Sequence, residues 1–366
     1  MDLKDIVVDK ETLQKVVDNR SYNNLIVDYY KEFSNSGSIS FNKDLLIKKG
    51  ERLDYCNKYW QLDKYEKLKI KDFKKTNLCH DKFCANCKKV RQAGRMAKYI
   101  PELEKYKGNL FHLVLTVPNC SGQELNSTYK KMAKSFNMII RYLDGRLKIK
   151  NIDFSVFDYQ GAVRSLEVTF HGNSYHPHFH VGIVLNSNLF SLDSMNIIND
   201  FSYNNRYGIR ELKRLFCNEE ILIQKIWYLL INNIKVTEKS INGLSQGYSC
   251  MVNKFHENDY AELFKYISKG SDEKGNLLTY DNFVSLYYGL YRVKQIQGYG
   301  CLYRINDDMD LEELEQKYDD YIQNLKKKES PVVAYQTPQD LINDTKYTLI
   351  SRKSYFKYYQ NVLKNS

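Results

Sequence analysis

Three short segments dense in β-branched and aromatic residues, 111–117, 162–170 and 178–185, predict strands near the middle of the chain. Between the first two, apolar side chains recur at helical spacing and predict a helix: Met132, Phe136, Ile139, Ile140 and Leu143. We expect a further helix over roughly 10–34 and a mainly helical region over 190–270. Together these patterns predict a strand-rich region over 109–185 that contains one helix and is followed by a mainly helical region.

The last two of these strands alternate between apolar and polar positions, so each has one face for a core. His178 and His180 share the polar face of 178–185, and Glu167 lies on the polar face of 162–170. If the two strands pair through the turn between them, Glu167 joins both imidazoles. Two histidines and a carboxylate form an open three-ligand site for a divalent ion. The alternative is a histidine pair in a polar turn, satisfied by neighbouring backbone groups.

The segment 258–270 has apolar residues at the spacing of one buried helical stripe, and Gly270 suits the C-terminal cap. Glu262, Tyr266 and Lys269 would then share one helical face. A tyrosine hydroxyl can attack phosphorus, a nearby lysine favours its phenolate, and a glutamate one turn away can activate water. This row of side chains is either a catalytic face or an ordinary solvated one.

Four cysteines from two short polar segments predict a tetrahedral structural zinc site: Cys56, Cys79, Cys84 and Cys87. His80 competes as the fourth ligand, and buried cysteines without a metal are the alternative. A basic run follows and predicts contacts with DNA phosphates, although a solvated helix face has the same composition: Lys88, Lys89, Arg91 and Arg95.

Charge and composition narrow the class of protein. Lys+Arg 55 against Asp+Glu 44 leaves a net charge of +11, which makes nucleic acid the first partner to test. A hydrophobic content of 43% is typical of a globular chain. No apolar run is long enough for a membrane helix, and the first residues lack the pattern of a secretion signal. We therefore expect a cytoplasmic protein with reduced thiols.

The order of these parts resembles the replication initiator (Rep) proteins of small rolling-circle plasmids, in the HUH endonuclease superfamily. It resembles the branch whose third motif pairs a glutamate with a tyrosine one turn later. Segments 111–119, 176–185 and 262–272 are similar to motifs 1, 2 and 3, and 289–305 is similar to the closing segment. The cysteine-rich stretch departs by lacking a proline between its last two cysteines, and motif 2 departs by having Gly182 in place of a larger apolar residue.

The resemblance implies an α+β fold with a central antiparallel sheet, a ferredoxin-like HUH nuclease core over 109–305. A cysteine-rich zinc- and DNA-binding region over 51–108 would precede this core. Outside the resemblance, we expect a helical segment over 1–50 and a helical basic tail over 306–366.

The resemblance also implies a mechanism. Mg²⁺ or Mn²⁺ would be held by His178, His180 and Glu167. Tyr266, with Lys269 beside it, would nick single-stranded or extruded hairpin origin DNA and leave a 5′-phosphotyrosine and a free 3′-OH. Glu262 would serve in termination. Because no P-loop motif occurs in the chain, a host helicase would unwind the duplex and a host polymerase would extend the 3′-OH. Whether the chain forms a homodimer stays an open question.

Three rival interpretations share part of these residues. An HUH relaxase or single-strand transposase would use the same histidines and tyrosine. A non-catalytic, zinc-dependent DNA-binding regulator explains the cysteines and the basic charge but not the histidine pair. A metallohydrolase using the histidine cluster would form no covalent adduct with DNA.

Overall fold

The computed structural model describes residues 10–36, 41–56, 59–65, 70–76, 78–186, 188, 195–205, 208–244, 250–265, 277–303, 305 and 345–351. The chain divides into two compact units, a first unit of residues 1–97 and 309–366 and a second unit of residues 98–308. The boundary falls inside the helix α3 (Ala85–Glu104). The domain limits expected at residues 50, 108 and 305 stay predictions.

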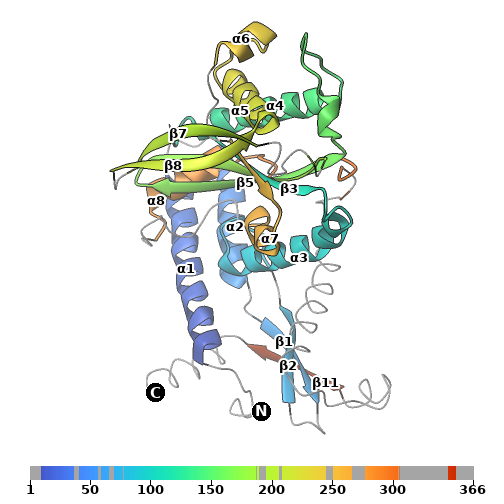
Figure 1. The fold of residues 1–366 in the computed structure, drawn as a ribbon. Coiled ribbons are helices and arrows are strands. Elements are labelled where there is room, and N and C mark those ends of the chain that lie inside the picture. The colour runs from blue at the N-terminus through green and yellow to red at the C-terminus, as the bar shows by residue number, and fades with distance from the viewer. Residues whose placement is uncertain are drawn as a thin grey trace, which may run out of the picture. The chain divides into compact units, whose positions relative to one another are not determined.

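The described residues of the first unit form two whole helices, the first part of α3 and a three-stranded antiparallel sheet (Figure 1). Helix α1 (Lys10–Asn35) confirms the helix expected over roughly 10–34. Helix α2 (Lys43–Tyr55) packs on α1 and begins at Asn42, whose side chain accepts from two backbone N–H groups of the first turn. The sheet has the order β11-β1-β2. Its strands are β1 (Tyr59–Tyr65), β2 (Ile70–Thr76) and β11 (Thr345–Ser351).

The expectation of a helical C-terminal tail is wrong for 345–351, because this segment pairs with β1 as a strand. The pairing joins residues almost 300 positions apart in sequence (Tyr59 with Ser351), which no local pattern can show. The rest of the tail lies outside the described residues.

The second unit is built on an antiparallel sheet of order β10-β5-β6-β3-β9, with the short β4 paired to β6. Its strands are β3 (Leu110–Thr116), β4 (Cys120–Ser121), β5 (Gly161–His171), β6 (Ser174–Val184), β9 (Cys250–Lys254) and β10 (Ile296–Gly300). The three strands expected from the sequence are confirmed as β3, β5 and β6. Strands β5 and β6 form a hairpin through Gly172 and Asn173, where Gly172 has a φ of +54°.

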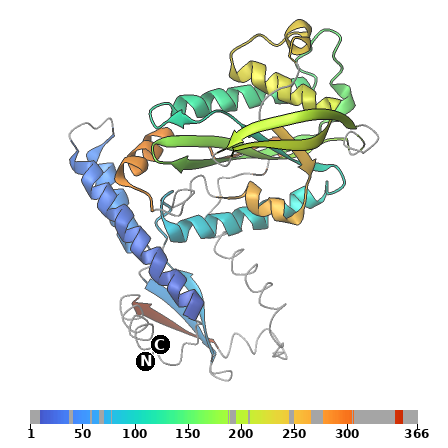
Figure 2. The same cartoon turned by 60° about the vertical axis from the view of Figure 1, so that its left-hand side comes forward.

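Helices cover the two faces of this sheet (Figure 2). Helices α4 (Leu125–Leu143) and α5 (Asn218–Ile231) lie side by side on the apolar face. There the Phe136 ring of α4 packs edge-on against Phe179 of β6, with ring centroids 6.1 Å apart. Helix α7 (Glu257–Leu263) lies on the opposite, polar face. The helix expected around 132–143 is therefore confirmed, and it covers the core.

The expectation that 190–270 is mainly helical is only partly right. Strands β7 (Met195–Asn205) and β8 (Gly208–Cys217) form a hairpin before α5, and β9 joins the sheet by pairing with β3. The asparagines that end β7 and the glycine that begins β8 are typical of hairpin turns, so the sequence carried a signal for this turn.

The short α6 (Glu238–Asn242) and α8 (Tyr280–Gly289) complete the regular structure of the second unit named here. Among the residues whose structure is described, no helix combines the length and apolar character needed to cross a membrane. The α+β class with an antiparallel sheet is thus confirmed.

Candidate active site

The polar face of the hairpin brings together the three residues expected to bind a divalent ion. In the register of β5 and β6, Glu167 lies opposite His178, and His180 lies two residues further along β6. One carboxylate oxygen, Glu167 Oε2, is 3.2 Å from His178 Nε2 and 3.2 Å from His180 Nε2. We call these residues the histidine–carboxylate triad. Its ligand atoms all lie within 4.8 Å of one another.

This geometry suits a small divalent ion. Octahedral coordination at about 2.1 Å places neighbouring ligand atoms about 3.0 Å apart, close to the spacing found here. The side chains are nearly buried: Glu167 is 5% exposed, His178 11% and His180 10%. Burial alone would raise the pKa of Glu167, but hydrogen bonds and charge from the two histidines hold it well below its usual range. The carboxylate is therefore ionised and ready to act as a ligand.

A second layer of residues supports the triad, and no pattern in the sequence indicated these residues. His112 of β3 has its Nε2 3.1 Å from His180 Nδ1, and the two rings are stacked with centroids 5.3 Å apart. On its other side, His112 Nδ1 is 3.0 Å from Asp259 Oδ1 of α7. A chain of contacts thus runs from a carboxylate through two imidazoles to the triad. We call His112 and Asp259 the supporting pair.

One set of proton positions satisfies all of these contacts when an ion is bound. His180 Nε2 must then be unprotonated, so its Nδ1–H donates to His112 Nε2, and His112 Nδ1–H donates to Asp259. His178 is arranged likewise, because its Nδ1 lies 3.2 Å from the His176 carbonyl oxygen. Burial lowers the pKa of His112, against the opposing effect of Asp259, so the ring is neutral as this scheme requires.

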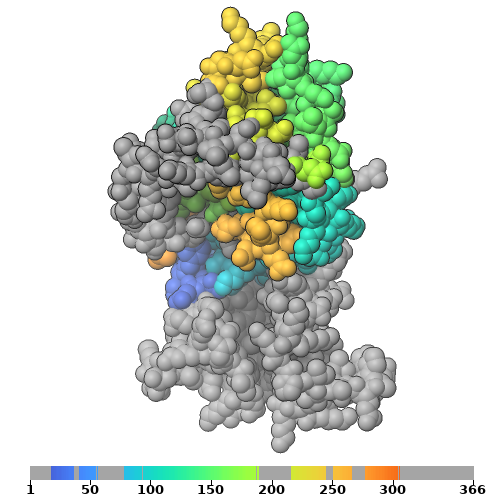
Figure 3. All heavy atoms as spheres, viewed as in Figure 1, coloured from blue at the N-terminus to red at the C-terminus, as the bar shows by residue number. Residues whose placement is uncertain are grey.

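Gly182 explains why α7 can approach this face. It follows His178 and His180 on the same side of β6, and a Cβ atom there would lie 3.3 Å from Leu263 Cδ2 of α7. The departure noted in motif 2 therefore gives the helix that carries Asp259 close access to the sheet. Helix α7 and β9 lie at the molecular surface, in orange in Figure 3.

The helix expected over 258–270 is shorter than predicted. Helix α7 ends at Leu263, and the Lys265 N–H bonds to the Glu262 carbonyl three residues back. The Lys265 carbonyl accepts from the Gln295 side chain, 30 residues further along the chain. The expected continuous face therefore has no support at 264–265. Tyr266 and Lys269 lie outside the described residues.

Glu262 itself is described, and it lies near the supporting pair. Its carboxylate pairs with the Lys265 ammonium. Its charge also acts on His112, where it favours the protonated imidazole. Glu262 is thus on the same face of the sheet as the triad, although no described contact joins it to the triad residues.

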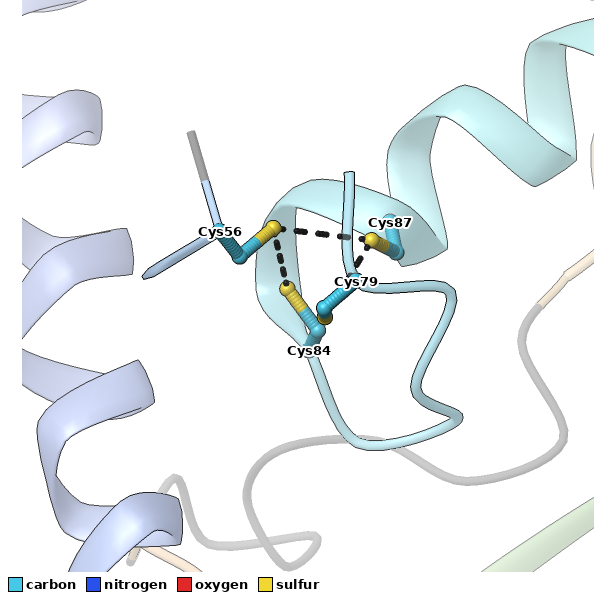
Figure 4. Close-up of side chains that lie close together, drawn as sticks. All are labelled: Cys56, Cys79, Cys84 and Cys87. Atoms are coloured by element: carbon cyan, nitrogen blue, oxygen red, sulfur yellow. Dashed lines mark hydrogen bonds between the residues drawn. The ribbon is translucent and has the colours of Figure 1, made fainter. Parts of the chain in front are cut away.

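The four cysteines expected to bind zinc converge in the first unit (Figure 4). Cys56 follows α2, while Cys84 and Cys87 lie at the start of α3, with Cys79 in the loop before it. The Sγ atoms are 3.4 Å apart for Cys56 and Cys84, 3.7 Å for Cys56 and Cys87, and 3.6 Å for Cys79 and Cys87. All are free thiols.

These spacings suit tetrahedral zinc. Zn–S bonds of about 2.3 Å place the sulfur atoms of a tetrahedron about 3.8 Å apart, whereas a disulfide needs about 2.0 Å. Thiol contacts, first with Cys56, lower the pKa of Cys84 and raise the pKa of Cys79 and Cys87, as expected where several thiols share the charge of one thiolate. His80, the alternative ligand, offers its backbone: its N–H donates to Cys87 Sγ at 3.3 Å. Its positive φ of 59° turns the loop toward the cluster.

The four basic residues after Cys87 differ in their exposure and contacts along α3. Lys88 is 7% exposed, its ammonium lies 5.5 Å from the centre of the Tyr22 ring, and burial lowers its pKa to about 8. Arg91 donates to the His80 carbonyl, so it braces the cysteine loop. Lys89 is exposed and Arg95 is half-buried. Phosphate contacts by these four residues stay a prediction.

The described geometry therefore defines an α+β protein with two candidate metal centres. Residues 70–205 match the family model for a replication protein, Rep_1. This segment contains the triad and three of the four clustered cysteines, but not Asp259, Glu262 or Tyr266.

Proteins named as replication (Rep) proteins are also similar to this chain in sequence. A "Protein rep" of Staphylococcus aureus is 27% identical over 228 residues, which cover 59% of this chain and 80% of that protein. A "Protein rep" of Streptococcus pneumoniae serotype 2 is 27% identical over 235 residues, 62% of this chain and 61% of that protein. No solved structure gives a significant match. The expected resemblance is confirmed: the chain is similar to Rep replication proteins.

Proposed function

We propose that the chain is a plasmid rolling-circle replication initiator of the HUH endonuclease type, which nicks origin DNA by tyrosine transesterification. The observation that carries this proposal is the histidine–carboxylate triad, nearly buried on the polar face of an antiparallel sheet, within the segment that matches the Rep family. A ferredoxin-like HUH core and a zinc-bound cysteine cluster are parts of the same proposal.

Each residue has a chemical role in this scheme. Glu167, His178 and His180 hold Mg²⁺ or Mn²⁺, which when bound polarises the scissile phosphate as a Lewis acid. The Tyr266 oxygen attacks phosphorus, so a tyrosine–phosphorus bond forms as the bond to the 3′-oxygen breaks. The products are a 5′-phosphotyrosine and a free 3′-OH. Lys269 favours the phenolate form of Tyr266.

Glu262 acts in a later step. Four residues before the nucleophile, it activates a water molecule in termination, so that the second cleavage leaves no second covalent adduct. Its influence on His112 supports a location beside the triad. The proposed partners are origin DNA, a host helicase and a host polymerase acting in the cytoplasm, with a homodimer as the open assembly.

The decisive experiment is adduct formation on labelled DNA. Single-stranded oligonucleotides tiled across the DNA element that encodes the chain, labelled at either end, are incubated with Mn²⁺ and run on a denaturing protein gel. We expect an adduct that carries only the label of the 3′ side and is absent in Tyr266→Phe. The control Tyr303→Phe, at an exposed tyrosine in the second unit, should keep it. An adduct that persists in Tyr266→Phe would move the nucleophile elsewhere.

A second candidate function, zinc-dependent DNA binding without catalysis, is favoured by the geometry of the cysteine cluster. The same gel separates the two: binding of verified origin DNA with neither cleavage nor adduct supports the regulator. Cleavage without an adduct supports a metallohydrolase.

A further inference from the structure

A cavity of about 550 Å³ lies in the second unit, and neither proposed metal centre uses it. Its walls come from α4, from α5 and from the loop that follows β3. The volume is within the range of small-ligand sites, about 300–1,000 Å³. At this cavity, α4 and α5 approach the end of β3 and the start of β6.

His176 connects this cavity to the triad. It lines the cavity, and it also stacks on His178, with ring centroids 5.3 Å apart and ring planes at 28°. The two residues are separated by two positions on one face of β6, roughly 7 Å at 3.3 Å per residue. A strand of DNA whose phosphate reaches the triad can therefore continue past His176 to the wall of the cavity.

The lining residues suit a nucleobase. Tyr228 is half-buried on α5 and contributes an aromatic ring to the lining. Trp227 beside it is 1% exposed, and its indole N–H donates to the Thr116 carbonyl at 2.8 Å, which fixes α5 to the end of β3. Aromatic side chains bind single strands because every base has a π-face.

Polar groups at the rim match the edges of a base. The Asn119 amide donates to Ser174 Oγ at 3.1 Å, and the Asn232 amide donates to the Tyr228 carbonyl at 2.9 Å. Each amide is thus oriented through its nitrogen, and its oxygen is the atom that can accept from a ligand. An amide oxygen accepts from base amino groups such as the N6 of adenine.

Charge distinguishes the base from the phosphate. Glu124 also lines the cavity as an ionised carboxylate, held by the Ser121 backbone N–H at 3.0 Å and its hydroxyl at 2.7 Å. A phosphate next to this carboxylate would be repelled. Lys131 on α4 lines another part of the wall, and Lys134 is exposed nearly one turn further along. These cations can neutralise the backbone while the base enters the cavity.

We propose that this cavity binds one nucleobase of the single-stranded DNA substrate, next to the nucleotide whose phosphate occupies the triad. The inference rests on the proposed function, since it takes the strand at the triad to be DNA. It adds a sequence-reading site to that function, because a base held in a shaped cavity restricts where the strand can be cut.

The test is an abasic scan of binding. A fluorescent oligonucleotide that the wild type nicks is remade with one abasic position at a time, and affinities are measured by anisotropy in Ca²⁺ to prevent turnover. We expect one position near the nick where loss of the base weakens wild-type binding by about 5- to 150-fold, the equivalent of 1–3 kcal/mol per stacked base. Tyr228→Ala should weaken the binding of intact DNA by a similar factor. Removing the base at that position should then cause no further loss of affinity.

Two matched variants keep the test interpretable. Tyr228→Phe preserves the ring and should bind like wild type, while Tyr303→Ala removes an exposed tyrosine near the edge strand β10 and should have no effect. If Tyr228→Ala does not fold, Asn232→Ala, on the exposed rim, replaces it and should reduce the abasic penalty.

The outcomes separate the two proposals. If the wild type forms the adduct but every abasic position costs the same in wild type and Tyr228→Ala, the base-binding cavity is refuted and nicking stands. If the wild type neither binds single strands nor forms an adduct, both proposals fail.

Discussion

The supporting pair gives a quantitative prediction for metal binding. In His112→Phe the ring volume is kept, but the acceptor 3.1 Å from His180 Nδ1 is lost. Without an ion, His180 can place its proton on Nε2, facing Glu167, and so avoid an unsatisfied donor. A bound ion forces the proton onto Nδ1, where the variant has no acceptor. The penalty therefore falls on the metal-bound state alone.

The size of the effect follows from the burial of His180, whose side chain is 10% exposed. An unsatisfied buried donor costs about 1–3 kcal/mol, which corresponds to roughly 5- to 150-fold in affinity. Loss of the hydrogen-bond partner of a histidine ligand typically lowers metal affinity by about 10–100-fold. We expect Mn²⁺ to bind His112→Phe within this range of loss. Asp259→Asn should lose less, because its amide oxygen can still accept from His112.

The assay is isothermal titration of zinc-loaded protein with Mn²⁺, with no DNA present. Glu257→Gln is the matched control, because it removes a carboxylate from the exposed first turn of α7 without a described contact to His112. Thermal unfolding of the zinc-loaded variants without Mn²⁺ reports separately on the lost His112–Asp259 bond, which does not depend on the ion. Equal Mn²⁺ affinity in wild type and His112→Phe would refute the role of the supporting pair.

Three further outcomes are expected. Cys84→Ser should lose the zinc that inductively coupled plasma mass spectrometry finds in wild type, whereas Cys120→Ser, at a cysteine of the second unit that is not part of the cluster, should keep it; zinc retained in Cys84→Ser would contradict the four-thiol site. Gly182→Val should destabilise the protein by about 1–3 kcal/mol in urea unfolding, because its side chain overlaps Leu263 of α7. Adding Leu263→Ala should recover part of that loss, and no recovery would place the clash elsewhere. Glu167→Gln should weaken Mn²⁺ binding at least about tenfold while leaving zinc content unchanged, and undiminished Mn²⁺ binding would remove Glu167 from the ligand set.

The sequence predicted the triad because the relevant information is local. Alternation with a period of two put Glu167, His178 and His180 on polar faces, and a hairpin brings such faces together without any long-range knowledge. The cysteine cluster was predictable for a similar reason, since short spacing between thiols is itself a metal-site pattern.

The supporting pair was not predictable in this way. His112 and Asp259 are 147 residues apart, and they meet only because β3 lies beside β6 while α7 crosses the same face. Read alone, His112 is one polar position in an apolar strand. The end of α7 was missed for a related reason. Apolar spacing continues past Leu263 in the sequence, whereas the Lys265 carbonyl accepts a hydrogen bond from the distant Gln295 side chain, a contact that no local pattern can show.

The pairing of β11 with β1 has a consequence for synthesis on the ribosome. Residues 98–308 are contiguous, so the second unit can fold as soon as they have emerged. The three-stranded sheet of the first unit cannot be completed until residue 351 has been made, although β1 and β2 appear before residue 80. During that interval β1 has one edge without its native neighbour, and an exposed strand edge invites pairing with other chains. The first unit is therefore the last to close and the part of the nascent chain most in need of a chaperone.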